Sequence, residues 1–180
     1  MDFYRFSIVL FLAVLLASCE SNFKDVQRIN SVEFSPSGIS ENINLKYTDS
    51  GKVKAILISP LMLDFSNLEY GFNEFPKGVD VTLIGEKGEK SYVKSDYAIT
   101  YAKTHIIDLQ GNVKITGSDG SVLTTEQLYY DQKNEWFYTE KKFKFTDKQS
   151  FYEGVGVDFS KDFKVFNAQQ NHGLIDNVEE

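Results

Sequence analysis

IDLQGNVKI, residues 107–115, is the stretch that decides the fold class of this chain. Its apolar residues, Ile107, Leu109, Val113 and Ile115, recur at every second position around Gly111, and polar residues occupy the positions between them. Successive side chains of a β-strand point to opposite faces, so a period of two indicates one buried and one solvated face. The stretch therefore predicts a β-strand.

The same alternation recurs through most of the chain, with turn-forming residues between the repeats. It is visible in VDVTL at 79–83, YAITY at 97–101, KKFKF at 141–145 and VGVDF at 155–159, and turns such as EKGEK at 86–90 separate these segments. GNVKIT at 111–116 resembles KKFKFT thirty residues later, which is typical of stacked strand–turn–strand units. The sequence predicts an all-β fold, an elongated, twisted and open stack of antiparallel strands. Residues 60–70 fit a helical turn or an edge strand equally well.

The amino terminus carries the chain's single cysteine, Cys19, directly after a short apolar run. Arg5 precedes this run, residues 8–17, which spans about 15 Å as a helix, half of a hydrocarbon core about 30 Å thick. A basic start, a short apolar centre and small residues before the cysteine are typical of a secretory signal. LASC at 16–19 resembles a bacterial lipobox, which predicts cleavage after Ser18 and lipid attachment to Cys19. The alternative is a free cysteine buried in a helix.

The chain is predicted to have four parts. These are a lipoprotein signal peptide at 1–18, a lipidated amino terminus and polar tether at 19–44, a β domain at 45–170 and a polar tail at 171–180. The formal net charge is −7 and there is no basic run, which argues against nucleic acid as a partner and against a direct clamp for phosphates. With one cysteine the chain cannot form an internal disulfide.

The sequence lacks the motifs of a catalytic site. His105 and His172 are far apart, and neither has metal-ligand spacing to other residues. No G-x-S-x-G elbow, H-E-x-x-H motif or phosphate-binding loop is present. We therefore expect no enzymatic activity, no metal and no cofactor. A carboxylate pair acting on glycosidic bonds remains an alternative that sequence alone does not test.

The alternation predicts one apolar face that points inward. Its members are Val79, Val81, Leu83, Tyr97, Ile99, Ile107, Leu109, Val113, Ile115, Leu123, Leu128, Phe143, Phe145, Val155, Val157 and Phe159. Such a face either forms a closed core, which every β protein needs, or lines a groove for an apolar ligand. Gly154 and Gly156 interrupt the last of these strands, and glycine inside a strand marks a bend or a close approach of another backbone or ligand.

Five segments, in this order and spacing, resemble the LptC family. They are FNEFPKGVDVTL at 72–83, SDYAITY at 95–101, LQGNVKIT at 109–116, DGSVLTTEQLYYD at 119–131 and FYEGVGVDF at 151–159. The family is the periplasmic component of the lipopolysaccharide export machine of double-membraned bacteria. The resemblance implies an open, boat-like β-jellyroll of the OstA/LptA type. Many members are fixed by one transmembrane helix, whereas this chain has the lipobox-like segment at Cys19 instead.

The resemblance also implies a function and partners. Lipopolysaccharide would pass from an inner-membrane ABC transporter, LptF and LptG with the ATPase LptB, to this protein and on to the bridge protein LptA. The acyl chains would occupy an apolar groove lined by the inward face, at the periplasmic side of the inner membrane. The alternative is a structural envelope lipoprotein that links other proteins by strand-edge pairing and carries no lipid. The outermost strands are expected near Leu45–Ile58 and Lys164–Ala168.

Overall fold

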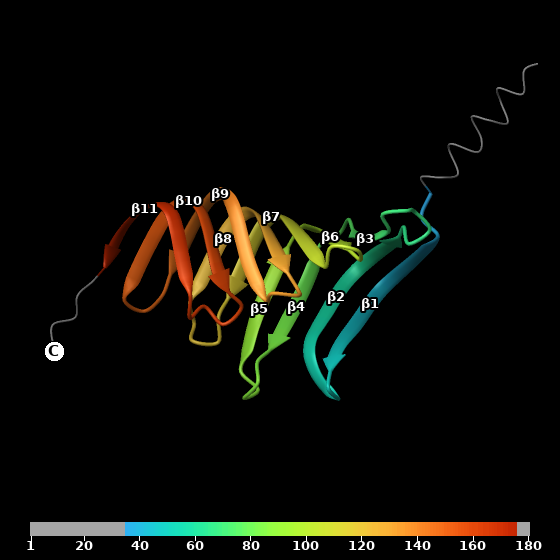
Figure 1. The fold of residues 1–180 in the computed structure, drawn as a ribbon, viewed down its shortest axis with the longest axis horizontal. Helices are drawn as coiled ribbons and strands as arrows, with labels where there is room; N and C mark the ends of the chain where they lie inside the picture. Colours follow the sequence, from blue (N-terminus) through green and yellow to red (C-terminus); the bar gives the residue numbers. More distant parts are fainter. Residues whose placement is uncertain (1–34, 176–180) are drawn as a thin grey trace, which may run out of the picture. The chain divides into compact units, whose positions relative to one another are not determined.

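The computed structural model describes residues 35–175, so Cys19, the predicted signal peptide and most of the predicted tether lie outside the described residues. Within this range eleven strands form one antiparallel sheet (Figure 1). The strands are β1 (Gly38–Asp49), β2 (Lys52–Asp64), β3 (Phe72–Phe75), β4 (Val79–Ile84), β5 (Lys90–Ser95), β6 (Tyr97–Tyr101), β7 (Ile106–Thr116), β8 (Val122–Asp131), β9 (Trp136–Thr146), β10 (Ser150–Ser160) and β11 (Phe166–Ile175). The all-β, antiparallel prediction is confirmed.

The sheet is an up-and-down meander in which strands that are neighbours in sequence are also neighbours in space. β2 pairs with β4 at one end and β3 at the other, and β7 pairs in the same way with β5 and β6. β3 and β4 are therefore two halves of one long strand, as are β5 and β6. From β7 onward each strand pairs with the next along the chain, up to β11.

Several of the strands bend or break near the middle of the sheet. The bends lie between the two segments of β2 that pair with β4 and β3, at Gly78, at Asp96, and at register shifts after Gln110, Thr125 and Val155. Gly78, Gly111 and Gly156 have φ of 80°, 72° and 76°, a conformation that glycine adopts without steric cost. A bulge adds one residue to a strand and bends it. Because adjacent strands bend side by side, the sheet folds over and encloses its apolar face.

Buried hydroxyl groups hold these bends. Ser59 Oγ donates to the carbonyl of Gly78 at 2.7 Å, Ser95 Oγ to that of Tyr97 at 2.9 Å, and Thr125 Oγ1 to that of Lys142 at 2.8 Å. A bulge breaks the regular ladder, and buried backbone groups left without a strand partner need another one. These buried polar residues therefore have a structural role.

The bends also change which residues face inward. After the break at Asp96, Ala98 is 1% exposed and faces the interior, whereas the Tyr97 hydroxyl donates to Glu74 on the outer face. Ile99 shares the outer face with Tyr97, so the predicted inward orientation of both was wrong. The bulge at Gly156 has the same effect on β10, where Val155 is 39% exposed and Val157 is 1% exposed. The prediction for Val155 was therefore also wrong, because alternation does not continue across a bulge.

The ends of the sheet differ from the expected boundaries. β1 starts at Gly38, inside the predicted tether, and β11 continues to Ile175, inside the predicted tail. β1 pairs with β2 and β11 with β10, so these two are the edge strands of the described residues. Lys164 and Val165 precede β11 and lie in the β10–β11 turn. β2 runs through to Asp64, so the first part of residues 60–70 is strand and the rest is a turn.

Candidate functional site

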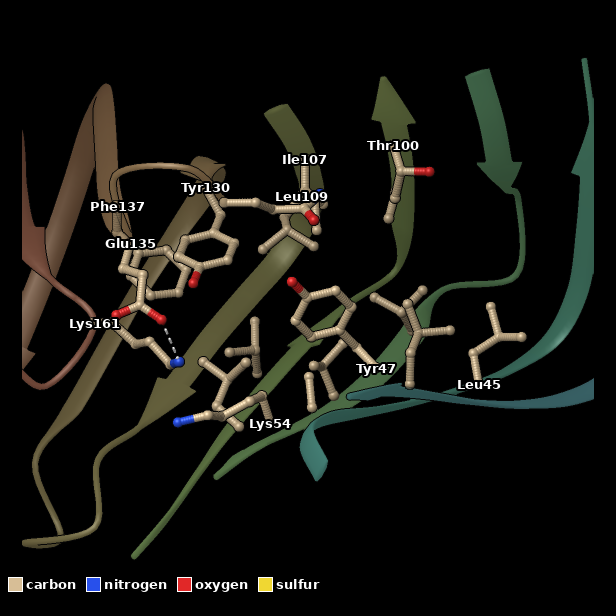
Figure 2. Close-up of a pocket in the computed structure, with 18 of the residues that line it drawn as sticks. Leu45, Tyr47, Lys54, Thr100, Ile107, Leu109, Tyr130, Glu135, Phe137 and Lys161 are labelled. Atoms are coloured by element: carbon tan, nitrogen blue, oxygen red, sulfur yellow. Dashed lines mark hydrogen bonds and ion pairs between the residues drawn. The ribbon is translucent and has the colours of Figure 1, made fainter. Parts of the chain in front are cut away.

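A cavity of about 610 Å³ lies within the folded sheet and is lined by strands β1 to β9 (Figure 2). Its apolar wall includes Leu57 on β2, Phe75 on β3, Leu83 on β4, Val93 on β5 and Leu109 on β7. These strands contribute side chains from the enclosed face of each bend, so the cavity follows directly from the folding of the sheet. A second and more open hollow of about 770 Å³ is lined by residues of β7 to β10, including Val113, Phe143 and Val155.

The structure divides the predicted inward face into two groups. Five of its members line this cavity: Val79, Val81, Leu83, Ile107 and Leu109. Eight others are at most 7% exposed and pack in the hydrophobic core: Val113, Ile115, Leu123, Leu128, Phe143, Phe145, Val157 and Phe159. The bend predicted near Gly154 and Gly156 is present at Gly156, whereas Gly154 pairs regularly with Phe143.

Sequence reasoning missed several residues of the cavity wall. Leu57 and Ala55 belong to the unbroken apolar run AILI, where alternation gives no inward face. Val93 does alternate with polar neighbours in SYVKS and would have been found by the same rule. Tyr130 comes from β8, where the inward phase changes at the central bend. Phe137 keeps the phase of Phe143 on β9, but it stands in the aromatic run WFY, where alternation gives no inward face.

Two tyrosines add polar groups to the cavity. Tyr47 on β1 is 61% exposed and its ring projects into the opening in Figure 2. Tyr130 on β8 lies deeper, and burial followed by the charge of Glu135 raises the pKa of its hydroxyl. Tyr130 therefore stays neutral at physiological pH and offers the cavity a phenol without charge.

Rings close the cavity on the side of β8 and β9. Tyr130 stacks on Phe137 with centroids 4.4 Å apart, and Phe137 stacks on Phe159 at 5.2 Å. Beyond them lies a continuous set of rings that we call the aromatic cluster, made of Phe137, Phe143, Phe145, Tyr152, Phe159, Phe163 and Phe166. Stacked and tilted rings at these distances are favourable contacts, so this part of the interior is filled.

Charged side chains surround the opening, which we call the cavity mouth. It carries Asp49, Lys54, Glu86, Lys133, Glu135 and Lys161. Lys161 fixes one side of it, since its Nζ lies 2.9 Å from Glu135 Oε1 and its backbone N–H donates to the Glu135 carbonyl at 3.0 Å. The Lys161 side chain is 17% exposed, so this ion pair is partly shielded from water.

The polar groups of the described residues do not form a recognisable catalytic centre. Among the residues whose burial the structure describes, Asp108 is the one buried carboxylate, and amide groups of Gln110 and Gln127 donate to its two oxygens at 2.7 and 2.9 Å. In residues 35–175 no three His, Cys, Asp or Glu side chains gather as a potential metal site. Every buried side-chain nitrogen or oxygen in that range has a hydrogen-bond partner. Asp108 is thus satisfied as a structural group.

Comparison with known protein families matches residues 6–172 to the family described as "Lipopolysaccharide-assembly, LptC-related". The chain belongs to the LptC family. The match covers the whole described sheet up to the middle of β11. No curated protein matches the chain at a significant level. Among the described residues, no helix has the length and apolar character needed to cross a membrane.

Membership establishes the general role of the chain. The LptC family is a component of lipopolysaccharide transport, associated with the periplasm and the inner membrane, and is not a known family of enzymes. The resemblance drawn from the five sequence segments is confirmed, and so is the all-β fold that it implied. The apolar cavity is the feature of the structure that suits a lipid.

Proposed function

We propose that this LptC-family protein holds acyl chains of lipopolysaccharide in the cavity while the lipid passes from the inner-membrane transporter towards the outer membrane. The observation that carries the proposal is an apolar hollow of about 610 Å³ within an open sheet of a lipopolysaccharide-transport family. Ligand cavities typically measure about 300–1,000 Å³ and are lined mainly by apolar side chains. Each methylene group that leaves water is stabilised by about 0.8 kcal/mol.

The finer parts of the proposal concern the anchor and the partners. Lipid attached to Cys19 would hold the domain at the periplasmic face of the inner membrane, as the lipobox predicts. The transporter subunits LptF and LptG with the ATPase LptB would supply the lipid, and the bridge protein LptA would receive it. The β1 and β11 edges support pairing with neighbouring β domains, because a strand at the edge of a sheet has unpaired backbone groups.

The second candidate is a connector that pairs through these same edges and carries no lipid. The edges favour it, since they suit protein contacts whether or not a lipid is present. The cavity distinguishes the two functions, because a connector has no use for an enclosed apolar volume. The experiment must therefore report on the cavity directly.

Tyr47 and Tyr92 provide a matched pair for photo-crosslinking. Both are tyrosines on strands, 61% and 47% exposed, but Tyr47 lines the cavity and Tyr92 lies on the outer face beside the inward Val93. Each is replaced by benzoyl-phenylalanine in the full chain, expressed with the native transport machinery, and irradiated in cells.

Lipid transfer predicts lipopolysaccharide adducts at Tyr47 and none at Tyr92. The Tyr47 adducts should disappear when the ATPase of the transporter is inactivated. A connector predicts protein adducts at both positions and lipopolysaccharide at neither. That second result would reject the proposed function.

A further inference from the structure

The cavity mouth is not acidic, although the chain is. The formal net charge of the chain is −7, yet the mouth carries three lysines, Lys54, Lys133 and Lys161, against three carboxylates, Asp49, Glu86 and Glu135. The three lysines come from β2, the β8–β9 turn and the β10–β11 turn, so the fold brings them together from distant parts of the sequence. The net charge of the whole chain therefore does not describe the charge at this opening.

Two of these lysines form no ion pair with a side chain of the described residues, although the Lys133 backbone N–H donates to Asp131 Oδ1 at 2.9 Å. Four ion pairs occur in residues 35–175, and Lys161 is the one mouth lysine that takes part in them, through Glu135. Lys54 and Lys133 form none. Figure 2 shows the Lys54 side chain directed toward the same side of the opening as Lys161. A lysine beside an apolar hollow keeps its stem against the apolar wall and its ammonium group at the water boundary.

From this arrangement we infer that the cavity mouth binds the phosphorylated headgroup of the lipid whose acyl chains occupy the cavity, with Lys54 and Lys133 as its ligands. The inference rests on the proposed function. An amphiphile with its chains in the hollow necessarily places its headgroup at the opening. Ammonium groups form charge-assisted hydrogen bonds to phosphate oxygens, and these are about twice as strong as neutral ones.

The remaining charges of the chain explain why such a contact is needed. A phosphate group approaching a protein with a net charge of −7 is repelled at long range. At the mouth the three lysines balance the three carboxylates, and an ammonium group acts on a phosphate within about 10 Å, which is the Debye length at 0.1 M salt. Glu86 opposes them at the same mouth. Removing Glu86 and removing Lys54 should therefore have opposite effects on a phosphorylated ligand.

Two lipids and three variants of the full chain test the inference. The lipids are a hexa-acylated diphosphoryl disaccharide of the lipid A type and the same lipid after enzymatic removal of both phosphates. The variants are Lys54→Gln with Lys133→Gln, Glu86→Gln, and the control Lys46→Gln with Lys90→Gln. The control removes two positive charges from the outer face, where Lys46 on β1 pairs with Ile56 and Lys90 on β5 pairs with Ile84. Lys161 stays unchanged because it holds the β8–β9 turn.

Binding is measured as a dissociation constant in the same detergent at 50 and 200 mM salt. We expect wild type to bind the diphosphoryl lipid at least tenfold more tightly than the dephosphorylated lipid. The Lys54/Lys133 variant should lose this preference and its salt dependence while binding the dephosphorylated lipid as wild type does. Glu86→Gln should increase the preference, and the outer-face control should leave it unchanged.

Each other outcome overturns the inference in a distinguishable way. Equal weakening of both lipids in the Lys54/Lys133 variant would mean that the lysines support the cavity wall and not the headgroup. If the mouth variant and the outer-face control lose the preference for the diphosphoryl lipid to the same extent, the net charge of the protein, and not the position of the lysines, determines binding. Failure of wild type to bind either lipid would reject the proposed cavity function itself. Tight binding of both lipids by wild type without preference would reject the headgroup site alone.

Discussion

The cavity and the aromatic cluster occupy two regions of one folded meander, and they differ in the size of the side chains that point inward. In β4 and β6 these residues are Val79, Val81, Ala98 and Thr100, and the interior beside them is hollow. In β9 to β11 the inward residues are mainly phenylalanines, and their rings stack from Phe137 to Phe166. Both regions belong to the same folded sheet. The smaller inward side chains of β4 and β6 therefore account for the hollow beside them.

The comparison suggests that one region of the sheet stabilises the fold and the other binds the ligand. The aromatic cluster stabilises the fold, because burying a large ring against others stabilises more than any other apolar contact. The cavity wall contributes less burial and is available to a ligand. Substitutions that separate stability from lipid binding can test this division.

The largest effect is expected at the centre of the aromatic cluster. Phe159 is 0% exposed, and its ring lies 5.2 Å from Phe137, 4.9 Å from Phe163 and 5.9 Å from Phe166. Phe159→Ala should lower the free energy of unfolding by about 3–5 kcal/mol, since it removes these contacts and leaves a void. Urea denaturation of the full chain measures it.

Phe151 on the same strand gives the matched control. It is 39% exposed, so Phe151→Ala removes the same atoms with much less loss of burial. We expect less than half of the Phe159 effect. Equal losses at the two positions would show that the aromatic cluster is not the main source of stability.

A smaller loss is expected at the bulge of β10, which sets the phase of the strand beside the aromatic cluster. Gly156 has a φ of 76°, and a Cβ at this position would lie 2.7 Å from Gln169 Oε1. Gly156→Ala should cost about 1–3 kcal/mol of stability, because a non-glycine residue is strained at this φ. Gly154→Ala on the same strand is the control, since Gly154 has no positive φ. A neutral result at both sites would mean that the bulge relaxes without cost.

These bends also explain how far sequence alone could go. Alternation around Leu109 and Val113 was enough to predict an antiparallel all-β fold, because the period of two holds within each half-strand. It failed at Tyr97 and Ile99, which follow the bend at Asp96 on the same short strand, and at Val155, which directly precedes the bulge at Gly156. At Asp96 and at Gly156 the inward phase moves by one residue, whereas on β7 Leu109 and Val113 keep one phase across the bulge. The sequence does not show which bends move the phase.

The cavity was harder to predict than the fold. An inward residue packs in a core or lines a hollow according to the volume of the residues that face it from other strands. The alternation of apolar residues in the sequence does not show which residues face each other. Lys54 and Lys133 are isolated charges in the sequence, 79 positions apart, and they meet at the mouth only through the tertiary fold. The net charge of the sequence therefore predicted no phosphate contact, whereas the lysines at the cavity mouth favour one.

Binding, and not stability, should respond to a charge in the cavity wall. Leu57 lines the cavity and is half-buried, whereas its neighbour Ile58 is 51% exposed on the other face of β2. Leu57→Asp should weaken binding of lipopolysaccharide at least tenfold, because a carboxylate in an apolar site is costly unless it is paired. Ile58→Asp should bind as wild type does. Val113 is unsuitable for this test, since at 0% exposed a charge there would unfold the sheet.

Circular dichroism of both β2 variants must show a folded sheet before their affinities are compared. If Leu57→Asp and Ile58→Asp lose affinity equally, the lipid does not enter the cavity. If neither variant loses affinity, the lipid binds elsewhere on the sheet. Either result would remove the functional distinction between the two regions.

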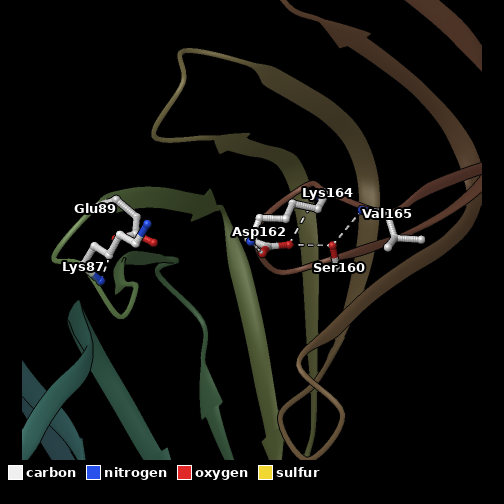
Figure 3. Close-up of polar contacts among 6 residues, drawn as sticks. All are labelled: Lys87, Glu89, Ser160, Asp162, Lys164 and Val165. Atoms are coloured by element: carbon white, nitrogen blue, oxygen red, sulfur yellow. Dashed lines mark hydrogen bonds and ion pairs between the residues drawn. The ribbon is translucent and has the colours of Figure 1, made fainter.

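The smallest expected effect concerns the β10–β11 turn, which joins the two regions. This turn carries Lys161 at the cavity mouth and Phe163 in the aromatic cluster. Asp162 between them accepts hydrogen bonds from Lys164 Nζ at 2.6 Å and from Ser160 Oγ at 2.8 Å, and Ser160 Oγ accepts one from the Val165 N–H at 3.0 Å (Figure 3). The facing β4–β5 turn contributes the charges of Glu86 and Glu89, which favour the charged form of Lys164.

These contacts make the turn sensitive to acid in a defined window. The hydrogen bond from Lys164, then that from Ser160, lowers the pKa of the Asp162 carboxyl from 3.8 to about 2. Because the folded-state pKa is the lower one, the stabilisation is complete above about pH 4 and is lost as the pH falls through about 2. Carboxyl carbon shifts in an NMR titration should give a midpoint near 2 in wild type, and Lys164→Gln should move it back towards 3.8. Phe163 ring signals should change over the same interval. A wild-type midpoint that stays near 3.8 would show that the turn is not held by Asp162, and that Lys161 and Phe163 keep their places through the mouth ion pair and the aromatic cluster alone.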